Sequence, residues 1–197
     1  MASSLKLIVG LGNPGQAYSK TRHNVGVWLI EMLAKQYACS LKLQTKFKAQ
    51  IGQCDINGQP LILAVPTTYM NESGLPVRAI SQFYKIKPEE ILVIHDELDL
   101  PVGHIKFKFD GGHGGHNGLR DIMLHIDSKR FLRLRIGIGK PKNKDEGKHY
   151  VLNVPPLHEI KLINNAIDNA LIELPFAVIG ELEKAMMRLH TDIPPTL

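Results

Sequence analysis

The sequence is poor in cysteine and has no long apolar run. Cys39 and Cys54 are the only cysteines among 197 residues, too few for a disulfide scaffold, and they predict a reducing, cytoplasmic environment. No apolar run approaches the roughly 18 residues of a membrane span, and Met1–Ser4 lead into a short apolar run rather than a secretory leader. With 44% hydrophobic and 22% charged residues, the composition excludes a disordered chain or a fibre. We therefore expect a cytoplasmic globular protein in which residues 1–197 form a single domain.

Two common catalytic motifs are missing, and a third is present only in part. The sequence contains neither the Gly-x-x-x-x-Gly-Lys-Ser/Thr loop of many nucleotide-binding enzymes nor the Gly-x-Ser-x-Gly turn of serine hydrolases. Gly10-x-Gly12-x-x-Gly15 is similar to a dinucleotide-binding motif, in which the helix begins within the glycine turn. Here Pro14 and Gln16–Thr21 delay the helix, so we expect an ordinary tight turn.

The surplus of basic charge is concentrated in one segment. The formal net charge is +5, but residues 1–101 carry +2, residues 102–150 carry +6 and residues 151–197 carry −3. Such a cluster is typical of proteins that bind a phosphate-rich partner, because neutralised phosphates release their counterions. A solvated basic face that only confers solubility explains the charge equally well. The basic residues of the segment are Lys106, Lys108, Arg120, Lys129, Arg130, Arg133, Arg135, Lys140, Lys142, Lys144 and Lys148.

The apolar periodicity predicts strands that alternate with helices. Strands are expected at Leu5–Val9, Lys46–Ile56, Pro60–Val65, Ile91–Ile94, Ile105–Phe109 and Leu132–Ile138. Helices are expected near Asn24–Ala38, after Pro76, around Leu119–Ile126, and near Pro156–Leu171 and Phe176–Leu189. Asn57-Gly58 suits the tight turn of a hairpin. The pattern predicts an α/β protein, a single domain with a twisted mixed, mostly parallel central sheet flanked by helices.

Three of the expected strands run into polar segments, and a glycine-rich segment opens a helix. These segments are Gly10–Gly15, Pro66–Asn71, His95–Asp99 and Gly111–Gly118. Ligands of open α/β sheets bind beyond the carboxyl ends of the strands, so parallel strands would bring the first three segments together. Free N–H groups at the start of a helix suit an anionic or carbonyl oxygen. We therefore expect a site where the four segments converge.

His23 is the best candidate for a general base, because it follows a polar stretch, precedes a helix and titrates near neutral pH. Asp96 is expected to face the same crevice, where it would fix the imidazole tautomer and stabilise the protonated ring. The amides of Asn13, Asn71 and Asn117 would orient a peptide and donate to an oxyanion. Because no serine or cysteine nucleophile is evident, we expect direct attack by water.

Two other interpretations stay open from the residues alone. A metal-dependent hydrolase could use His95, Asp96, Asp99, His104, His113 and His116 as ligands. Glycines around His113 and His116 leave no rigid element to fix a metal there, and turn glycines with a helix cap at Asn117 explain the same segment. A non-catalytic RNA-binding module would explain the basic segment, although not the histidine, aspartate and asparagines at strand ends.

Five motifs together resemble those of the bacterial-type peptidyl-tRNA hydrolase family. They are Gly10-Leu-Gly-Asn-Pro-Gly15, Thr21-Arg-His-Asn24, Pro66-Thr-Thr-Tyr-Met-Asn71, His95-Asp-Glu-Leu-Asp-Leu-Pro101 and Gly111-Gly-His-Gly-Gly-His-Asn-Gly118. The resemblance extends from about Leu5 to Leu189. It implies a monomeric α/β enzyme that needs no cofactor or metal and does not act at a membrane. The implied reaction is hydrolysis of the ester between a peptide and the 3′-terminal adenosine of tRNA, which recycles tRNA from stalled translation.

The resemblance also implies roles for four residues in the reaction. His23 would be the general base and Asp96 would support it. Asn13 would hold the peptide near the scissile ester and help to reject aminoacyl-tRNA with a free amino group. Asn117 would position the water and the peptide carbonyl.

Further residues at matching positions are implied to bind the substrate. Tyr18, Tyr69 and Asn71 would contact the terminal nucleotide or the peptide. Met70 would pack against the site and His116 would shape its entrance. The implied clamp for tRNA phosphates consists of Lys106, Lys108 and Arg135.

Overall fold

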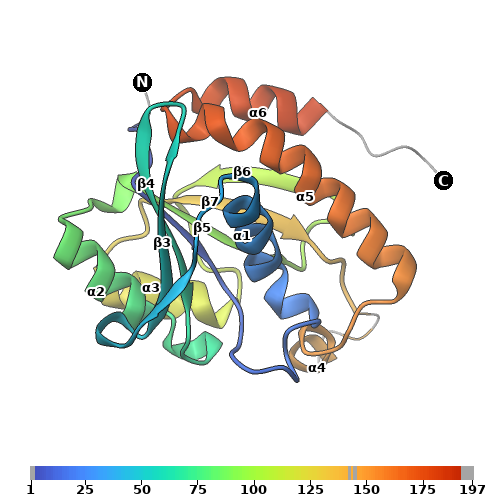
Figure 1. The fold of residues 1–197 in the computed structure, drawn as a ribbon. Coiled ribbons are helices and arrows are strands. Elements are labelled where there is room, and N and C mark those ends of the chain that lie inside the picture. Colours follow the sequence, from blue (N-terminus) through green and yellow to red (C-terminus); the bar gives the residue numbers. More distant parts are fainter. Residues whose placement is uncertain (1–2, 142, 144–145, 192–197) are drawn as a thin grey trace.

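A seven-stranded mixed sheet forms the centre of the molecule (Figure 1). The computed structural model describes residues 3–141, 143 and 146–191. The strands are β1 (Leu7–Gly10), β2 (Lys42–Gln44), β3 (Ala49–Ile56), β4 (Gln59–Pro66), β5 (Ile91–Glu97), β6 (Ile105–Phe109) and β7 (Leu132–Gly137), and their spatial order is β2-β3-β4-β1-β5-β7-β6. The four central strands β4, β1, β5 and β7 are parallel, whereas β2, β3 and β6 pair antiparallel at the two edges. The predicted mixed α/β sheet with a parallel centre is confirmed.

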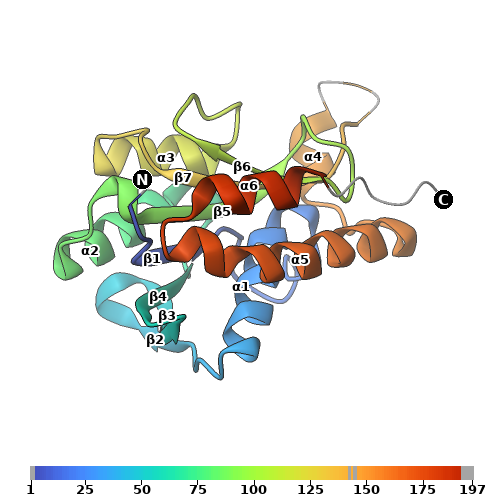
Figure 2. The same cartoon turned by 90° about the horizontal axis from the view of Figure 1, so that it is seen from above.

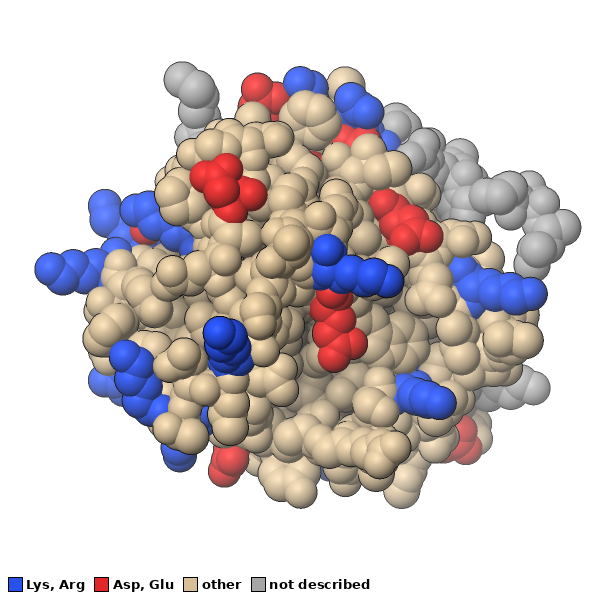
Figure 3. Space-filling view, viewed as in Figure 1, with Lys and Arg blue, Asp and Glu red and all other residues tan. Residues whose placement is uncertain are grey.

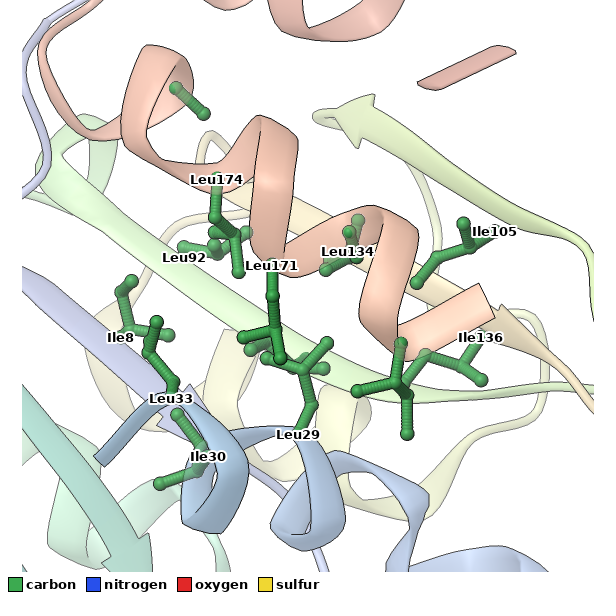
Figure 4. Packing of buried hydrophobic residues seen from close by; sticks show 14 of the residues in the cluster. Ile8, Leu29, Ile30, Leu33, Leu92, Ile105, Leu134, Ile136, Leu171 and Leu174 are labelled. Atoms are coloured by element: carbon green, nitrogen blue, oxygen red, sulfur yellow. The ribbon is translucent and has the colours of Figure 1, made fainter. Parts of the chain in front are cut away.

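Helices cover both faces of this sheet (Figure 2). They are α1 (Val25–Gln36), α2 (Gly74–Tyr84), α3 (Asn117–Ile126), α4 (Gly147–Val151), α5 (Leu157–Val178) and α6 (Leu182–Thr191). Helices α1, α5 and α6 pack on one face in a cluster that includes Ile8, Leu92 and Leu134 (Figure 4). Helices α2 and α3 pack on the other face, against a cluster that includes Leu7 and Val93. Successive strand residues therefore bury opposite sides, which explains the continuous apolar runs of the central strands.

The hairpin between β3 and β4 turns as predicted. Asn57 and Gly58 have φ values of 55° and 81°, the pair of positive angles that a type I′ turn requires. The first strand of the hairpin was predicted to begin at Lys46, and that start is wrong. Residues Thr45–Phe47 form a short 3₁₀ helix, and Lys48 takes a left-handed conformation before β3 begins.

The boundary between the last two helices was also predicted wrongly. Helix α5 does not end at Leu171 but continues through Pro175 to Val178, because its buried stripe continues through Leu174, Ala177 and Val178. The chain turns instead at Gly180, where φ is 90°. Proline interrupts only part of the hydrogen-bond pattern, whereas a glycine in the left-handed region ends the helix.

Three further differences concern short elements. Strand β2 and helix α4 were not predicted, because three and five residues give too little periodicity to detect. Helix α2 begins at Gly74 rather than after Pro76, so Pro76 lies within the first turn. A backbone N–H group at such a position has no partner within the helix, so a proline, which lacks this group, is tolerated there. In the described residues, no helix has the length and apolarity needed to span a membrane.

Candidate active site

The polar segments converge at the carboxyl edge of the parallel strands, as predicted. Strand β1 lies between β4 and β5, and the three strands run in the same direction. Strand β5 extends to Glu97, so His95 and Asp96 lie within the strand rather than after it. Helix α1 begins only at Val25, which excludes the dinucleotide-type glycine turn.

Two glycines allow helix α1 to pack unusually close to the sheet. A Cβ atom at Gly10 would lie 2.4 Å from the carbonyl oxygen of Gly26, and one at Gly26 would lie 2.4 Å from the carbonyl oxygen of Ile94. Helix α1 can therefore pack directly on β1 and β5. This close approach positions the 3₁₀ helix Arg22–Asn24, and with it His23, beside the end of β5.

His23 and Asp96 form a buried hydrogen-bonded pair. His23 Nδ1 lies 2.8 Å from Asp96 Oδ1, and the two residues are 9% and 3% exposed. Burial alone would lower the pKa of His23, but the charge and hydrogen bond of Asp96 raise it above its ordinary value. Burial would raise the pKa of Asp96, but His23 and His116 hold it far below the usual range. Asp96 is therefore a carboxylate that accepts a hydrogen bond from the Nδ1–H group of His23, which leaves Nε2 as the basic nitrogen.

His116 shares the same carboxylate oxygen. Its Nε2 lies 3.0 Å from Asp96 Oδ1, and its Nδ1 accepts a hydrogen bond of 3.3 Å from the backbone N–H of Leu119. The second bond caps α3, so the cap is His116 and not Asn117, which the alternative interpretation of this segment had assigned as the cap. Because Nδ1 is an acceptor, the proton of the neutral ring is on Nε2 and is donated to Asp96. Sequence reasoning placed His116 at the entrance and missed this bond.

One possible ligand atom from each of His23, Asp96 and His116 lies within 4.8 Å of the others, a spacing compatible with a metal ion. A metal at His116 Nε2 would displace the proton that this atom donates, while Nδ1 already accepts from Leu119. Asp96 Oδ1 is likewise occupied by two donors. The donor set therefore fits a hydrogen-bonded acid–base network better than a metal.

The remaining predicted metal ligands have other surroundings. His95 Nδ1 donates to the carbonyl oxygen of Asp96, and burial together with the nearby His116 and Arg133 lowers the pKa of His95 to about 3. His113 Nδ1 accepts from the N–H of Gly115. Asp99 forms an ion pair of 2.6 Å with Lys140. His104 lies outside the group formed by His23, Asp96 and His116 in the described part of the chain.

Asn13 is fixed by the backbone around it. The N–H of Met70 donates to Asn13 Oδ1 over 2.8 Å. Asn24 forms reciprocal bonds with Asn13: Asn24 Oδ1 accepts from its N–H and Asn24 Nδ2 donates to its carbonyl oxygen, over 2.9 and 3.0 Å. Asn24 belongs to the Thr-Arg-His-Asn motif, but its role was not recognised from the sequence.

The other predicted substrate contacts lie on the loops that follow β1 and β4. Tyr18 and Tyr69 pack edge to face with ring centres 6.4 Å apart, and Tyr69 is 55% exposed. Met70 is buried, and its sulfur would lie 2.6 Å from a Cβ atom at Gly118, so it packs against the start of α3. Asn71 is exposed on the short 3₁₀ helix Met70–Glu72. The structure thus brings the loops after β1 and β4 together.

A cavity of about 450 Å³ lies beside the histidine–aspartate pair. Its lining includes His23, Asp96 and Asn117, the glycine-rich segment and, from α4, Lys148. Arg22, next to His23, holds α4 in place: its guanidinium donates to Glu159 of α5 over 2.8 Å and lies over the ring of Tyr150. The sequence analysis counted Lys148 only in the basic segment and Arg22 only within the Thr21–Asn24 motif, because α4 was not predicted. A second cavity of about 520 Å³, near Lys6 and Tyr84, contains none of the predicted site residues.

The basic residues of β6 and β7 lie on the same face of the sheet. Lys106 pairs with Arg135, and Lys108 with Arg133, across the antiparallel ladder. Lys106 and Lys108 are exposed, whereas Arg135 forms an ion pair of 2.8 Å with Glu97. Lys142 and Lys144 lie outside the described residues. On the face seen in Figure 3, basic side chains are interspersed with acidic ones, and several basic side chains lie close together at the left edge.

The fold and the site together define an α/β enzyme with a histidine–aspartate pair at the carboxyl edge of its parallel strands. The sequence model of the peptidyl-tRNA hydrolase family matches residues 7–196. A peptidyl-tRNA hydrolase from Legionella pneumophila is 51% identical over 187 residues, covering 95% of this chain and 99% of the relative. One from Vibrio parahaemolyticus is 50% identical over 192 residues, covering 97% and 98%.

The structural comparison agrees with the sequence comparison. A crystal structure of peptidyl-tRNA hydrolase from Acinetobacter baumannii is 48% identical, with a TM-score of 0.94 and 97% of each chain covered. The chain belongs to the peptidyl-tRNA hydrolase family, and it is an enzyme that hydrolyses peptidyl-tRNA.

Proposed function

We propose that the chain cleaves the ester between the peptide and the 3′-terminal adenosine of tRNA with a water molecule activated by His23. The observation that carries this proposal is the 2.8 Å hydrogen bond from His23 Nδ1 to the buried carboxylate of Asp96, on the wall of the cavity. This bond fixes the tautomer in which Nε2 has a lone pair for a proton of water.

The proposed reaction has two proton transfers. His23 Nε2 removes a proton from water as the oxygen attacks the ester carbon, which gives a tetrahedral intermediate and an imidazolium ring. Asp96 stabilises this cation through Nδ1. When the intermediate collapses, the imidazolium returns the proton to the departing 3′-oxygen of the adenosine. The products are tRNA with a free hydroxyl and a peptide carboxylic acid, which loses its proton to the solvent.

Amide side chains would position the substrate in this reaction. Asn117 lies at the first position of α3 and lines the cavity next to His23 and Asp96, where it can bind the water and the peptide carbonyl. Asn13 would hold the peptide and help to reject aminoacyl-tRNA. Tyr18, Tyr69, Met70, Asn71 and His116 would complete the binding surface around the terminal nucleotide and the peptide.

Lys106, Lys108 and Arg135 are the proposed contacts for tRNA phosphates. The two lysines are exposed on the edge strand β6, and Arg135 lies opposite Lys106 on β7. The ion pair with Glu97 occupies Nε of Arg135. We therefore expect Arg135 to contribute less to phosphate binding than either lysine.

We also propose that the enzyme acts in the cytoplasm as a monomer and needs no cofactor. An ester is sufficiently activated for a positioned water, a base and amide donors. The test measures free tRNA released from N-acetyl-aminoacyl-tRNA and from unblocked aminoacyl-tRNA, with and without a chelator. Cleavage of the blocked substrate alone, at the same rate with chelator, is expected. Loss of activity on chelation would contradict cofactor independence, and tight binding without cleavage would favour the non-catalytic RNA-binding module.

A further inference from the structure

The segment that joins β6 to α3 (Figure 2) ends at His116, directly before Asn117, and consists mostly of glycine. Gly111, Gly112, Gly114 and Gly115 lie between Asp110 and His116. A Cβ atom at Gly112, Gly114 or Gly115 would meet no other atom within 4 Å. Glycines lose the most conformational freedom on folding, so such a segment needs an anchor from elsewhere if it is to hold a fixed shape.

Arg133 of β7 supplies direct contacts to this segment. Its Nη1 donates to the carbonyl oxygen of Gly112 over 2.6 Å, and its Nη2 donates to the carbonyl oxygen of Gly111. The guanidinium carbon also lies 4.9 Å from the centre of the Phe131 ring. The planar fork of an arginine matches two adjacent acceptors in a way that a lysine ammonium cannot.

The burial of the charged Arg133 side chain is energetically unfavourable. Arg133 is 2% exposed, and no carboxylate forms an ion pair with it in the described part of the chain. Burial and the neighbouring Arg135 lower its pKa, an effect that Asp110 only partly opposes. A buried cation destabilises a fold unless its hydrogen bonds compensate. Its two Nη bonds are made to the glycine-rich segment, so the segment is what this residue supports.

We propose that Arg133 is a positioning residue, which holds Gly111 and Gly112 and thereby fixes His116 and Asn117 against the catalytic pair. The connection runs along four residues of backbone to His116, which donates to Asp96 and caps α3. Asn117 follows at the first position of that helix. The proposal rests on the proposed roles of Asp96 and Asn117. It also separates Arg133 from the phosphate clamp, because its guanidinium is buried beneath the segment.

The test compares three variants. Arg133→Met removes the fork at similar length, and Arg133→Lys keeps the charge but cannot hold both carbonyls. Arg130→Met is the matched control. It removes the same charge three residues away, and the side chain of Arg130 is 65% exposed. We would measure kcat and KM for N-acetyl-aminoacyl-tRNA, the salt dependence of tRNA binding, and amide hydrogen exchange over residues 110–117.

Both Arg133 variants should lose roughly 10- to 100-fold in kcat, the loss expected when reacting groups are misplaced by about an ångström. KM and the salt dependence should stay within about twofold of wild type, since no phosphate contact is lost. Amide exchange should accelerate over residues 110–117 but not in the central strands. Arg130→Met should match wild type in kcat and in exchange.

Three results would overturn the proposal. Wild-type kcat in Arg133→Lys would mean that the fork is unnecessary. A weaker salt dependence with raised KM would make Arg133 a phosphate contact. Faster exchange throughout the protein, with kcat falling in step with the folded fraction, would make its role merely structural, and Arg133→Lys answers this if Arg133→Met does not fold. The exchange measurement needs no turnover, so it tests the anchor even if the proposed roles of Asp96 and Asn117 fail.

Discussion

Replacing Asp96 with asparagine should slow the reaction by about a thousandfold. The 2.8 Å bond between His23 Nδ1 and Asp96 Oδ1 joins a cation and an anion in the transition state. With their charge centres about 4 Å apart and an effective dielectric constant of about 20, their attraction is about 4 kcal/mol. Because about 1.4 kcal/mol corresponds to a factor of ten in rate, losing it lowers kcat by about 10³-fold.

The same substitution should move the pH dependence of the reaction. Asp96 raises the pKa of His23 above 6.5, and burial acts in the opposite direction. A general base works only when it is unprotonated. Wild-type kcat/KM should therefore begin to fall at a pH that is still above 6.5, as His23 becomes protonated. In Asp96→Asn only the burial effect remains, and the acidic limb should move below 6.5.

The assay measures the release of free tRNA from N-acetyl-aminoacyl-tRNA between about pH 5 and pH 9, in steps of about half a pH unit. Asp99→Asn is the matched control, because Asp99 lies three residues away on the surface and pairs with Lys140. It should keep wild-type kcat and the wild-type acidic limb. An Asp96→Asn enzyme with wild-type kcat, or with an unmoved limb, would refute the reasoning.

Three further predictions concern the base, the clamp and the support of α4. His23→Ala should nearly abolish turnover while tRNA still binds in a filter assay. Substantial remaining activity would contradict the role of His23 as the general base. Lys106→Met and Lys108→Met should each flatten the log–log salt dependence of tRNA binding by roughly 0.7–0.9, whereas an unchanged slope would count against that lysine. Arg22→Met leaves the partly buried carboxylate of Glu159 unpaired and should lower the free energy of unfolding by about 3–5 kcal/mol in urea titrations; a loss below about 1 kcal/mol would show the ion pair to be dispensable.

The fold was largely predictable because its central strands are buried on both faces. Ile91–Ile94 is apolar at every position, since Leu92 packs on one side of the sheet and Val93 on the other. The hairpin was predictable because Asn57 and Gly58 tolerate positive φ at little cost. The edges were harder: exposed β2 buries no side chain, so no apolar period marks it.

The site was predictable at the level of residues and less so at the level of contacts. His23 and Asp96 could be paired because parallel strands bring their ends together. The second bond to Asp96, from His116, depends on the conformation of a glycine-rich segment, which no periodicity describes. Arg133 and Arg135 look equivalent in the sequence, both alternating with leucine or isoleucine, yet one binds backbone carbonyls and the other a carboxylate. The neighbours that decide this come from other parts of the chain.

The hydrogen bond from the Met70 N–H to Asn13 Oδ1 determines which end of this amide can meet the substrate. The oxygen is turned toward the main chain, so the Nδ2 group, which has two hydrogens to donate, is the end turned away from it. If Asn13 holds the peptide as proposed, a peptide carbonyl satisfies that group, whereas the ammonium of an unblocked aminoacyl-tRNA presents a second donor and a positive charge. In the proposed role of Asn13, one backbone amide would thus orient the side chain so that it binds a blocked substrate and repels the free ammonium of aminoacyl-tRNA.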